Sequence, residues 1–225
     1  MGTNDIPTTA SAEEIARFTA MADAWWDPNG KFKPLHQINP VRIGYIRDLI
    51  CQKHDRDPKG TKPLDKIKLL DIGCGGGLLC EPMRRLGATV TGIDAGEKNI
   101  AIASLHAEQS GLNINYRHQL PEDLTNTKGI FDVVLNMEVI EHVADVDSFL
   151  KASVSLVKPG GLMVLSTINR TMKSFALAKV GAEYILRWLP VGTHDWRKFV
   201  KPSELASGLR PYKVDITDVT GMVYN

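Results

Sequence analysis

From residue 64 onward, short apolar runs alternate with longer amphipathic segments, and this alternation limits the folds open to the chain. The predicted strands span residues 68–72, 88–93, 114–116, 131–135 and 162–167. The predicted helices span residues 78–86, 97–110 and 145–157, and a turn is expected at 158–161. Repeated strand–helix–strand units of this length require a parallel sheet with right-handed crossovers. We therefore expect an α/β fold with a doubly wound, mainly parallel sheet.

The first 63 residues (1–63) do not follow this alternation and are predicted to form a helical extension with a linker. Ser11 and Glu14 fit a capping box at the start of an amphipathic helix. A second helix is expected after Asn39, with Pro40 in its first turn. The charged stretch 53–63 contains proline and glycine and is the predicted linker.

Size and charge are typical of one α/β domain with an extension. The chain has 225 residues, and we assign 64–225 to the main domain, with an inserted helical segment at 171–200 after the fifth strand. A net charge of +1 gives no long-range field that would attract nucleic acid. The three cysteines show no CxxC spacing, and no apolar run approaches the roughly 18–20 residues of a membrane span. We expect a cytoplasmic protein that can still contact a membrane surface.

The first predicted strand runs directly into a glycine-rich loop, DIGCGGG at residues 71–77. Crowded glycines indicate that a ligand approaches the backbone more closely than a Cβ atom would allow. The second strand ends at Asp94, where a doubly wound fold places an acid that hydrogen-bonds both hydroxyls of a ribose. Loop and acid together predict a Rossmann-like site for a nucleoside-containing cofactor.

The glycine spacing narrows the choice of cofactor. A dinucleotide fingerprint, G-x-G-x-x-G, uses its third glycine to bring a helix N-terminus close to a pyrophosphate. Here the sixth position is Leu78 counted from Gly73, or Cys80 counted from Gly75. Asp71 would repel a pyrophosphate but suits a cofactor with an ammonium group, such as S-adenosylmethionine. The D-x-G-x-G-x-G pattern resembles the first motif of class I methyltransferases.

The loop allows three other interpretations. A glycine-rich turn without a ligand is the simplest of them, and a nicotinamide-dependent oxidoreductase shares the fold. A non-catalytic small-molecule sensor is the third, although the acids at positions 71, 94, 138 and 141 are all present.

A second group of chemically capable residues follows the fourth strand, at 137–143. Ligands of open α/β sheets bind beyond the carboxyl ends of the strands, so these side chains should face the crevice. If the stretch forms a helical turn, Glu138, Glu141 and His142 share one face, a spacing suited to metal ligation. The alternatives are that His142 is a general base beside the two glutamates, or that the cluster only caps a helix. Met137 is expected to be an apolar wall beside the adenine.

Several motifs lie outside the glycine loop. They are WWD at 25–27, FKPLH at 32–36, INP at 38–40, ME at 137–138, EHV at 141–143, LVKPGG at 156–161, TINR at 167–170, GAEY at 181–184 and GTHD at 192–195. Together with the loop they resemble the ubiquinone biosynthesis O-methyltransferase family of bacteria, which has a mitochondrial counterpart. The resemblance covers nearly the whole chain from Glu13. The glycine loop alone marks a large superfamily, whereas WWD, FKPLH and GAEY narrow the match.

The resemblance implies an activity and a set of site residues. It implies methylation of catechol-type hydroxyls on polyprenylated ubiquinone precursors, 3-demethylubiquinol and 2-polyprenyl-6-hydroxyphenol, with S-adenosylmethionine as the cofactor. Its cofactor contacts correspond to Arg42, Gly73, Asp94 and Met137, and the loop pattern adds Asp71 and Gly75. It also implies magnesium as a candidate second cofactor, with Glu138, Glu141 and His142 as ligands and candidate catalytic residues.

The stretch 173–198 combines apolar and aromatic side chains with basic ones. This composition suits either a helix packed on the core or a segment in a membrane interface. Each CH₂ of a lipid tail gains about 0.8 kcal/mol in the bilayer, so a polyprenyl substrate stays there and the enzyme must come to it. We therefore expect 173–195 to contact the inner face of the cytoplasmic membrane, and other enzymes of ubiquinone biosynthesis are candidate partners. Family members usually continue beyond Asn225, so we expect the closing strand of the sheet to be missing here.

Overall fold

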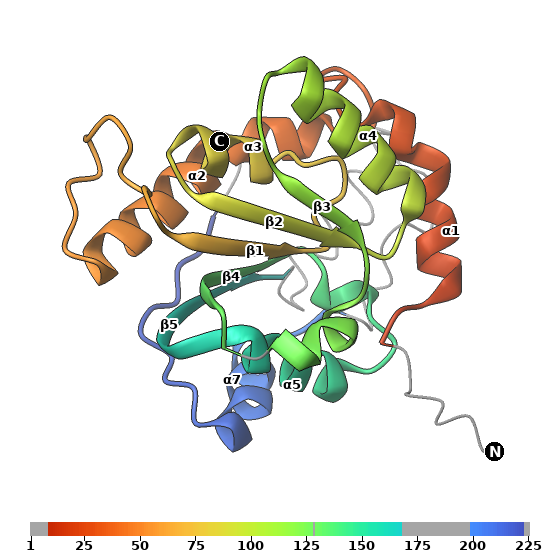
Figure 1. Cartoon of the computed structure of the whole chain (residues 1–225). Coiled ribbons are helices and arrows are strands. Elements are labelled where there is room, and N and C mark those ends of the chain that lie inside the picture. Colours follow the sequence, from red (N-terminus) through yellow and green to blue (C-terminus); the bar gives the residue numbers. More distant parts are fainter. Residues whose placement is uncertain (1–8, 128, 168–198, 223–225) are drawn as a thin grey trace.

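The computed structural model describes residues 9–127, 129–167 and 199–222, and a parallel five-stranded sheet lies at its centre (Figure 1). The strands are β1 Lys68–Ile72, β2 Thr89–Asp94, β3 Asn115–His118, β4 Phe131–Met137 and β5 Val157–Ser166. Their order is β3-β2-β1-β4-β5, and every neighbouring pair is parallel. The chain therefore changes direction across the sheet between β1 and β4, where ligands bind in folds of this kind. The predicted doubly wound α/β fold is confirmed.

Helices cover both faces of the sheet. The helices between strands are α3 Cys80–Arg85, α4 Glu97–Gln109 and α5 Val146–Leu156. In Figure 1, α3 and α4 lie on one side of the sheet, whereas α5 and the later helix α7 (Pro202–Leu209) lie on the other. This two-sided cover explains why the central strands are apolar on both faces.

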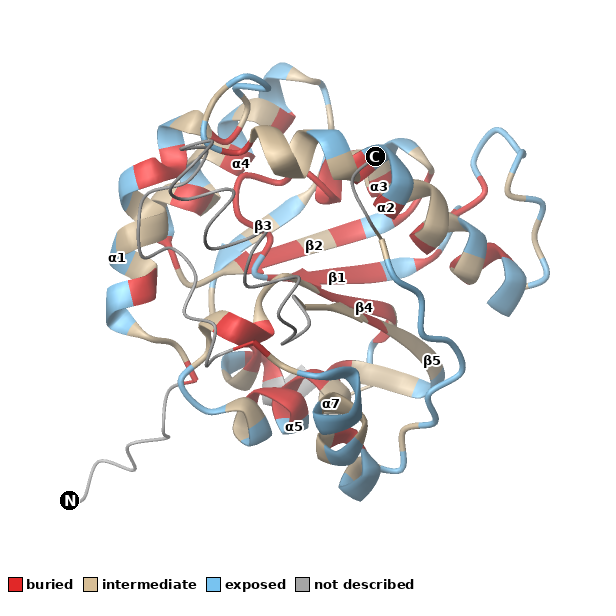
Figure 2. Cartoon of the chain, turned by 180° about the vertical axis from the view of Figure 1, so that it is seen from behind, coloured by how far each residue is buried: buried red, intermediate tan, exposed pale blue. Residues whose placement is uncertain are grey.

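Among the described residues, two of the three apolar clusters flank the sheet, one on each side, and the third centres on Trp25 and Phe32 of the N-terminal extension. Leu69 belongs to the cluster that includes Ile46 and Met83, while its neighbour Leu70 belongs to the cluster that includes Phe149. Both leucines are 0 % exposed, and Figure 2 shows β1 and β4 as almost wholly buried. Because successive side chains of a strand point to opposite faces, one strand supplies both clusters.

The prediction that a turn at 158–161 precedes the fifth strand was wrong, because β5 already begins at Val157. Val157 already pairs with Phe131, and Leu162 pairs with Val133, so the register shifts between the two pairs. Gly160 lies in this stretch with φ of +74°. The proline and glycines therefore make an irregularity within β5, because the strand begins before them and resumes after them.

The N-terminal extension contains α1 (Ala12–Met21), a 3₁₀ turn at Ala22–Ala24 and α2 (Lys33–Lys53). Ser11 is the residue before α1, as predicted, but its side chain makes no capping hydrogen bond. The expected capping box is absent because Glu14 is bonded to Arg17 and His142 instead.

The start of α2 was also predicted wrongly. The helix begins at Lys33, with a proline in its first turn, and Pro40 lies inside it. Val41 is 59 % exposed, whereas Asn39 and Arg42 are buried. An internal proline costs about 3 kcal/mol in an isolated helix, so tertiary contacts of the surrounding residues must offset this cost.

Part of the predicted organisation lies outside the described residues. Residues 168–198 contain most of the predicted insertion 171–200 and all of the predicted membrane contact 173–195. The division of the chain at residue 63 stays a prediction. Within the described ranges, no helix has both the length and the apolar character needed to cross a bilayer.

Gly44 offers a test of the packing of α2. It is a helical residue, and a Cβ atom added to it would meet nothing within 4 Å. Gly44→Ala should therefore raise the free energy of unfolding by about 0.5–1 kcal/mol in urea denaturation, because alanine restricts the unfolded chain more than glycine. The matched control is Gly111→Ala, which also enters open space but at a φ of +65°. We expect that variant to be destabilised, and equal shifts for both variants would contradict the prediction.

Candidate cofactor and acceptor site

The glycine turn after β1 folds back onto β2. The N–H groups of Gly73 and Cys74 both donate to the carbonyl oxygen of Ile93, at 2.8 and 3.0 Å. Gly73, Gly75 and Gly77 have φ values of +71°, +53° and +88°. Only glycine adopts this left-handed backbone without a steric penalty, so the turn requires these residues.

Protein side chains approach the glycines closely. A Cβ atom on Gly75 would lie 2.5 Å from the ring of Trp25, and one on Gly76 would lie 2.4 Å from the same side chain. A Cβ atom on Gly73 would lie 2.5 Å from Val139. The close approach that the sequence attributed to a ligand is thus made here by the N-terminal extension and by the segment after β4.

Asp94 ends β2 and lies beside the glycine turn, at the position the sequence predicts. Its Oδ2 accepts a hydrogen bond from the N–H of Gly75 at 2.9 Å. Its Oδ1 accepts from the N–H of Gly96 at 2.7 Å and from Nδ2 of Asn99 at 2.9 Å. These donors fix the carboxylate at the edge of the sheet where a ribose would bind.

Asp71 is a deeply buried acid at the end of β1. It is 2 % exposed, and the thiol of Cys80 donates to its Oδ2 at 3.2 Å. Burial raises the pKa of Asp71 to about 7, although the Cys80 hydrogen bond opposes this and nearby Asp94 adds to it. A cationic ligand beside Asp71 would favour its ionised form.

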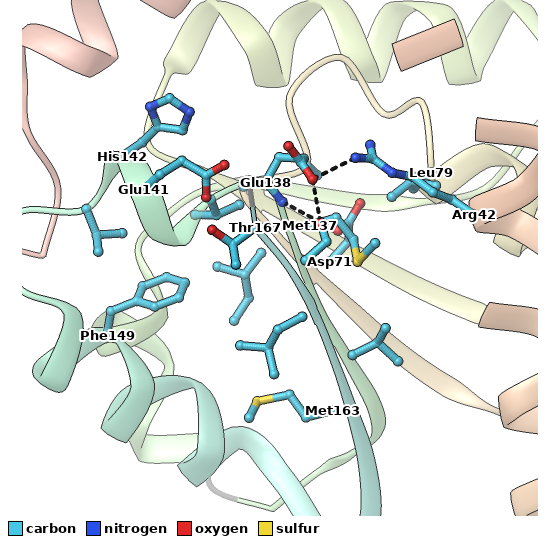
Figure 3. A pocket seen from close by; sticks show the side chains of 18 of the residues that line it. Arg42, Asp71, Leu79, Met137, Glu138, Glu141, His142, Phe149, Met163 and Thr167 are labelled. Atoms are coloured by element: carbon cyan, nitrogen blue, oxygen red, sulfur yellow. Dashed lines mark hydrogen bonds and ion pairs between the residues drawn. The ribbon is translucent and has the colours of Figure 1, made fainter. Parts of the chain in front are cut away.

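A hydrogen-bonded group joins Arg42 in the middle of α2, Glu138 directly after β4 and Ser166 at the end of β5. Figure 3 shows the bond between Arg42 and Glu138. Nη2 of Arg42 donates to Oε1 of Glu138 at 2.7 Å, and Oγ of Ser166 donates to the same oxygen at 2.8 Å. Arg42 is 6 % exposed, so its charge needs such a partner. Glu138 has φ of +58°, a strained conformation for a residue with a side chain, and such strain is concentrated at functional sites.

The helical turn expected over 137–143 is shorter than predicted. Strand β4 continues to Met137, Glu138 has a positive φ, and the 3₁₀ turn contains Ile140–His142 alone. Glu138 therefore shares no helical face with Glu141 and His142, because it precedes the turn.

His142 is paired with an acid from the N-terminal helix. Its Nδ1 lies 3.1 Å from Oε2 of Glu14, and the ring of Phe18 packs edge-on against the imidazole at 5.0 Å between centroids. Burial would raise the pKa of Glu14, but hydrogen bonds and charge from His142 and Arg17 outweigh it and lower the pKa to about 2. The sequence does not reveal this role of Glu14, because the residue also fits a local capping pattern.

Two of the three side chains proposed as metal ligands are paired with other residues. Glu138 is bonded to Arg42, and His142 is bonded to Glu14. In the part of the chain that the structure describes, no three His, Cys, Asp or Glu side chains are placed to hold a metal ion. In this arrangement the residues do not fit a magnesium site.

Every residue that the sequence predicts for the site lines one cavity of about 1810 Å³. These are Arg42, Asp71, Gly73, Gly75, Asp94, Met137, Glu138, Glu141 and His142. Figure 3 shows the polar groups at one end of the cavity, with Phe149 and Met163 further from them. The cavity thus joins a charged region beside the glycine turn to an apolar region over α5 and β5.

Comparison with known proteins defines the class. Residues 44–211 match the model of a methyltransferase domain family. The plantazolicin methyltransferase in complex with a substrate analogue and S-adenosylhomocysteine (SAH) has a TM-score of 0.60 at 15 % identity, over 89 % of this chain and 74 % of that one. The magnesium protoporphyrin IX methyltransferase of Synechocystis PCC 6803 has a TM-score of 0.57 at 19 % identity, over 80 % and 74 %. The fold and the domain define a class I, S-adenosylmethionine-dependent methyltransferase.

Closer relatives define the family within this class. The chain is 56 % identical over 218 residues to the ubiquinone biosynthesis O-methyltransferase of Brucella anthropi, covering 97 % of this chain and 88 % of the relative. It is 54 % identical to that of a Chelativorans species, covering 97 % and 86 %. The chain therefore belongs to the ubiquinone biosynthesis O-methyltransferase family.

Asp71→Asn tests the buried acid. Because the folded-state pKa is raised, the carboxyl group favours the folded state at low pH, and this contribution is lost as the pH rises through about 7. The gain in thermal stability of the variant over the wild type should therefore grow as the pH rises from about 4 to about 7 and stay constant at higher pH. Its affinity for SAH, by calorimetry, should fall about tenfold or more, because an amide does not pair with an ammonium group.

The matched control is Asp132→Asn, at the opposite end of β4. Asp132 is paired with Lys158 at 2.6 Å, and its pKa is lowered because hydrogen bonds from Lys158 and Lys68 outweigh burial. This control should lose stability at neutral pH and leave SAH binding unchanged. An Asp71→Asn protein with wild-type affinity would contradict the assignment.

Proposed function

We propose that the protein transfers a methyl group from S-adenosylmethionine to a phenolic hydroxyl of polyprenylated ubiquinone precursors. The proposed acceptors are the catechol-type rings of 3-demethylubiquinol and 2-polyprenyl-6-hydroxyphenol. The observation that carries the proposal is that one cavity brings a cofactor-type edge, with Asp71 and Asp94, next to a Glu–His pair and an apolar wall. The names of the close relatives support the choice of pathway.

The cofactor half of the site would use charges already in place. Asp71 would pair with the ammonium group and Asp94 would bind the ribose, while Met137 packs beside the adenine. The guanidinium of Arg42 uses Nη2 for Glu138 and has further N–H donors for a carboxylate. When bound, S-adenosylmethionine supplies an electrophilic methyl group on its sulfonium, so most of the rate enhancement should come from positioning the acceptor oxygen.

His142 would take the proton from the acceptor. A phenol with a pKa near 10 costs about 4 kcal/mol to ionise at neutral pH, so a base has a clear role. Glu14 is ionised at neutral pH and can only accept a hydrogen bond, so it selects the His142 tautomer with the proton on Nδ1. In that neutral tautomer Nε2 carries a lone pair that can accept the phenolic proton.

Glu138 and Glu141 would assist without a metal ion. Glu138 holds Arg42 at the cofactor side, and Glu141, 4 % exposed, precedes the proposed base in the same turn. We derive no step through magnesium, because the three candidate ligands do not form a metal-binding group in the described structure.

The polyprenyl tail would leave through the apolar part of the cavity. Phe149 and Met163 line this part (Figure 3). The segment 173–195 would contact the membrane in which the tail is dissolved, and its apolar, aromatic and basic composition supports this part of the proposal.

A methylation assay with short-chain prenylated catechols tests the acceptor and the metal together. We expect methylated product at the phenolic oxygen, with full activity after treatment with EDTA. Loss of activity that added magnesium restores would show that Glu138 and His142 exchange their present partners for a metal ion. Absence of methylation with any prenylated catechol, in a protein that binds SAH, would contradict the proposed acceptor.

Glu14→Gln tests the proposed base. The substitution removes the charge that holds the His142 proton on Nδ1, so kcat should fall about tenfold to a hundredfold while SAH affinity is retained. The pH–rate profile should also shift, which a merely structural effect would not cause. The matched control is Glu13→Gln, the exposed neighbour in the same turn of α1, which should behave as the wild type. Unchanged kcat and pH profile in Glu14→Gln would exclude His142 as a base oriented by Glu14.

A further inference from the structure

A buried asparagine connects the N-terminal extension to the proposed ribose-binding acid. Asn99 lies in the first turns of α4 and is 2 % exposed. Its Nδ2 donates to Oδ1 of Asp94 at 2.9 Å, and its Oδ1 accepts from Nε1 of Trp25 at 2.9 Å. The two bonds run in series, from indole to amide to carboxylate.

The amide of Asn99 is suited to this position chemically. A side-chain amide carries a donor and an acceptor on one planar group, so it can serve an indole N–H and a carboxylate at once. An aspartate there would place a second carboxylate against Asp94 and would repel it. Gly96 leaves room for the amide, since a Cβ atom on Gly96 would lie 2.8 Å from Nδ2 of Asn99.

Trp25 is held firmly at the other end of the series. Its ring stacks on Phe32 at 3.7 Å and 6° and lies against the glycine turn at Gly75 and Gly76. The extension is also fixed to α4 by the stacking of Trp26 on His106 at 3.5 Å and 4°. The placement of Trp25 therefore depends on how the whole extension packs on the cofactor edge.

The carboxylate of Asp94 has limited capacity for further hydrogen bonds. Its Oδ1 already accepts from Gly96 and Asn99, whereas Oδ2 accepts from Gly75. A carboxylate oxygen has about two acceptor positions, so Oδ2 is left with room for a ribose hydroxyl. The bond from Asn99 thereby decides which oxygen faces the cofactor.

We propose that Asn99 is a positioning residue for cofactor binding, which transmits the placement of Trp25 to the ribose-binding carboxylate of Asp94. The inference rests on the proposed function, in which Asp94 binds the ribose of S-adenosylmethionine. It gives the N-terminal extension a part in cofactor affinity as well as in covering the site.

Calorimetric titration with SAH tests whether the hydrogen bonds from Trp25 through Asn99 to Asp94 control cofactor affinity. Asn99→Ala should weaken binding about tenfold, since a hydrogen bond to a charged group is lost. Trp25→Phe keeps the aromatic ring and removes the N–H donor, and it should weaken binding about threefold or more. The double variant should bind no more weakly than Asn99→Ala, because the two residues act through one path. The KM for S-adenosylmethionine should rise by the same factors with kcat unchanged.

Trp26→Phe is the matched control. It removes a similar indole bond, from Nε1 of Trp26 to the carbonyl of Gly76 at 2.9 Å, which does not pass through Asn99. In the double variant of Trp26→Phe with Asn99→Ala, the loss of SAH affinity should equal the product of the two single losses. The inference fails if the affinity losses of Trp25→Phe and Asn99→Ala also multiply in their double variant. It fails as well if both single variants bind SAH as the wild type does.

The failure of the inference can be told apart from failure of the proposed function. If Asp94→Ala loses SAH binding while Asn99→Ala and Trp25→Phe retain it, Asp94 acts alone and the proposed function stands. If the wild-type protein shows no affinity for SAH, both are overturned. Trp25→Phe preserves the stacking on Phe32, so it decides the question even if Asn99→Ala does not fold.

Discussion

The carbonyl oxygen of Ile93 is the point on which the site depends. It accepts hydrogen bonds from both Gly73 and Cys74, and so it ties the turn after β1 to the last residues of β2. The turn can satisfy this geometry because its glycines adopt positive φ angles. As a result the N–H of Gly75 reaches Asp94, and two adjacent parallel strands present their acids at one edge of the sheet.

Around this edge, the N-terminal extension and the sheet meet through their functional groups. Arg42 of α2 is paired with Glu138 after β4, and Glu14 of α1 is paired with His142. A buried charge without a partner is costly, so each pair favours the packing of the extension as well as the chemistry of the site. The same contacts that would prepare cofactor and acceptor binding therefore stabilise the packing of α1 and α2 against the rest of the domain.

Buried charge also distinguishes the two halves of the cavity. Burial raises the pKa of Asp71 to about 7, and a cationic ligand would lower this pKa again. Glu14 is buried too, but its bonds to His142 and Arg17 lower its pKa to about 2, so it is a fixed negative charge. Asp71 would thus respond to a cationic ligand, whereas Glu14 is already paired with its neighbours, because the hydrogen-bond partners of the two acids differ.

The sequence by itself determined the alternation of strands and helices, the glycine turn and the position of Asp94, because strand periodicity and left-handed glycines are local properties. It misplaced the start of α2 and the turn at 158–161, where tertiary packing overrides local proline and glycine signals. Only the tertiary structure decided the partners of the charged residues. Glu14 reaches across 128 positions to His142, and Arg42 reaches across 96 to Glu138. Pairings at such separations are set by how helices pack on the sheet, and no local pattern encodes them.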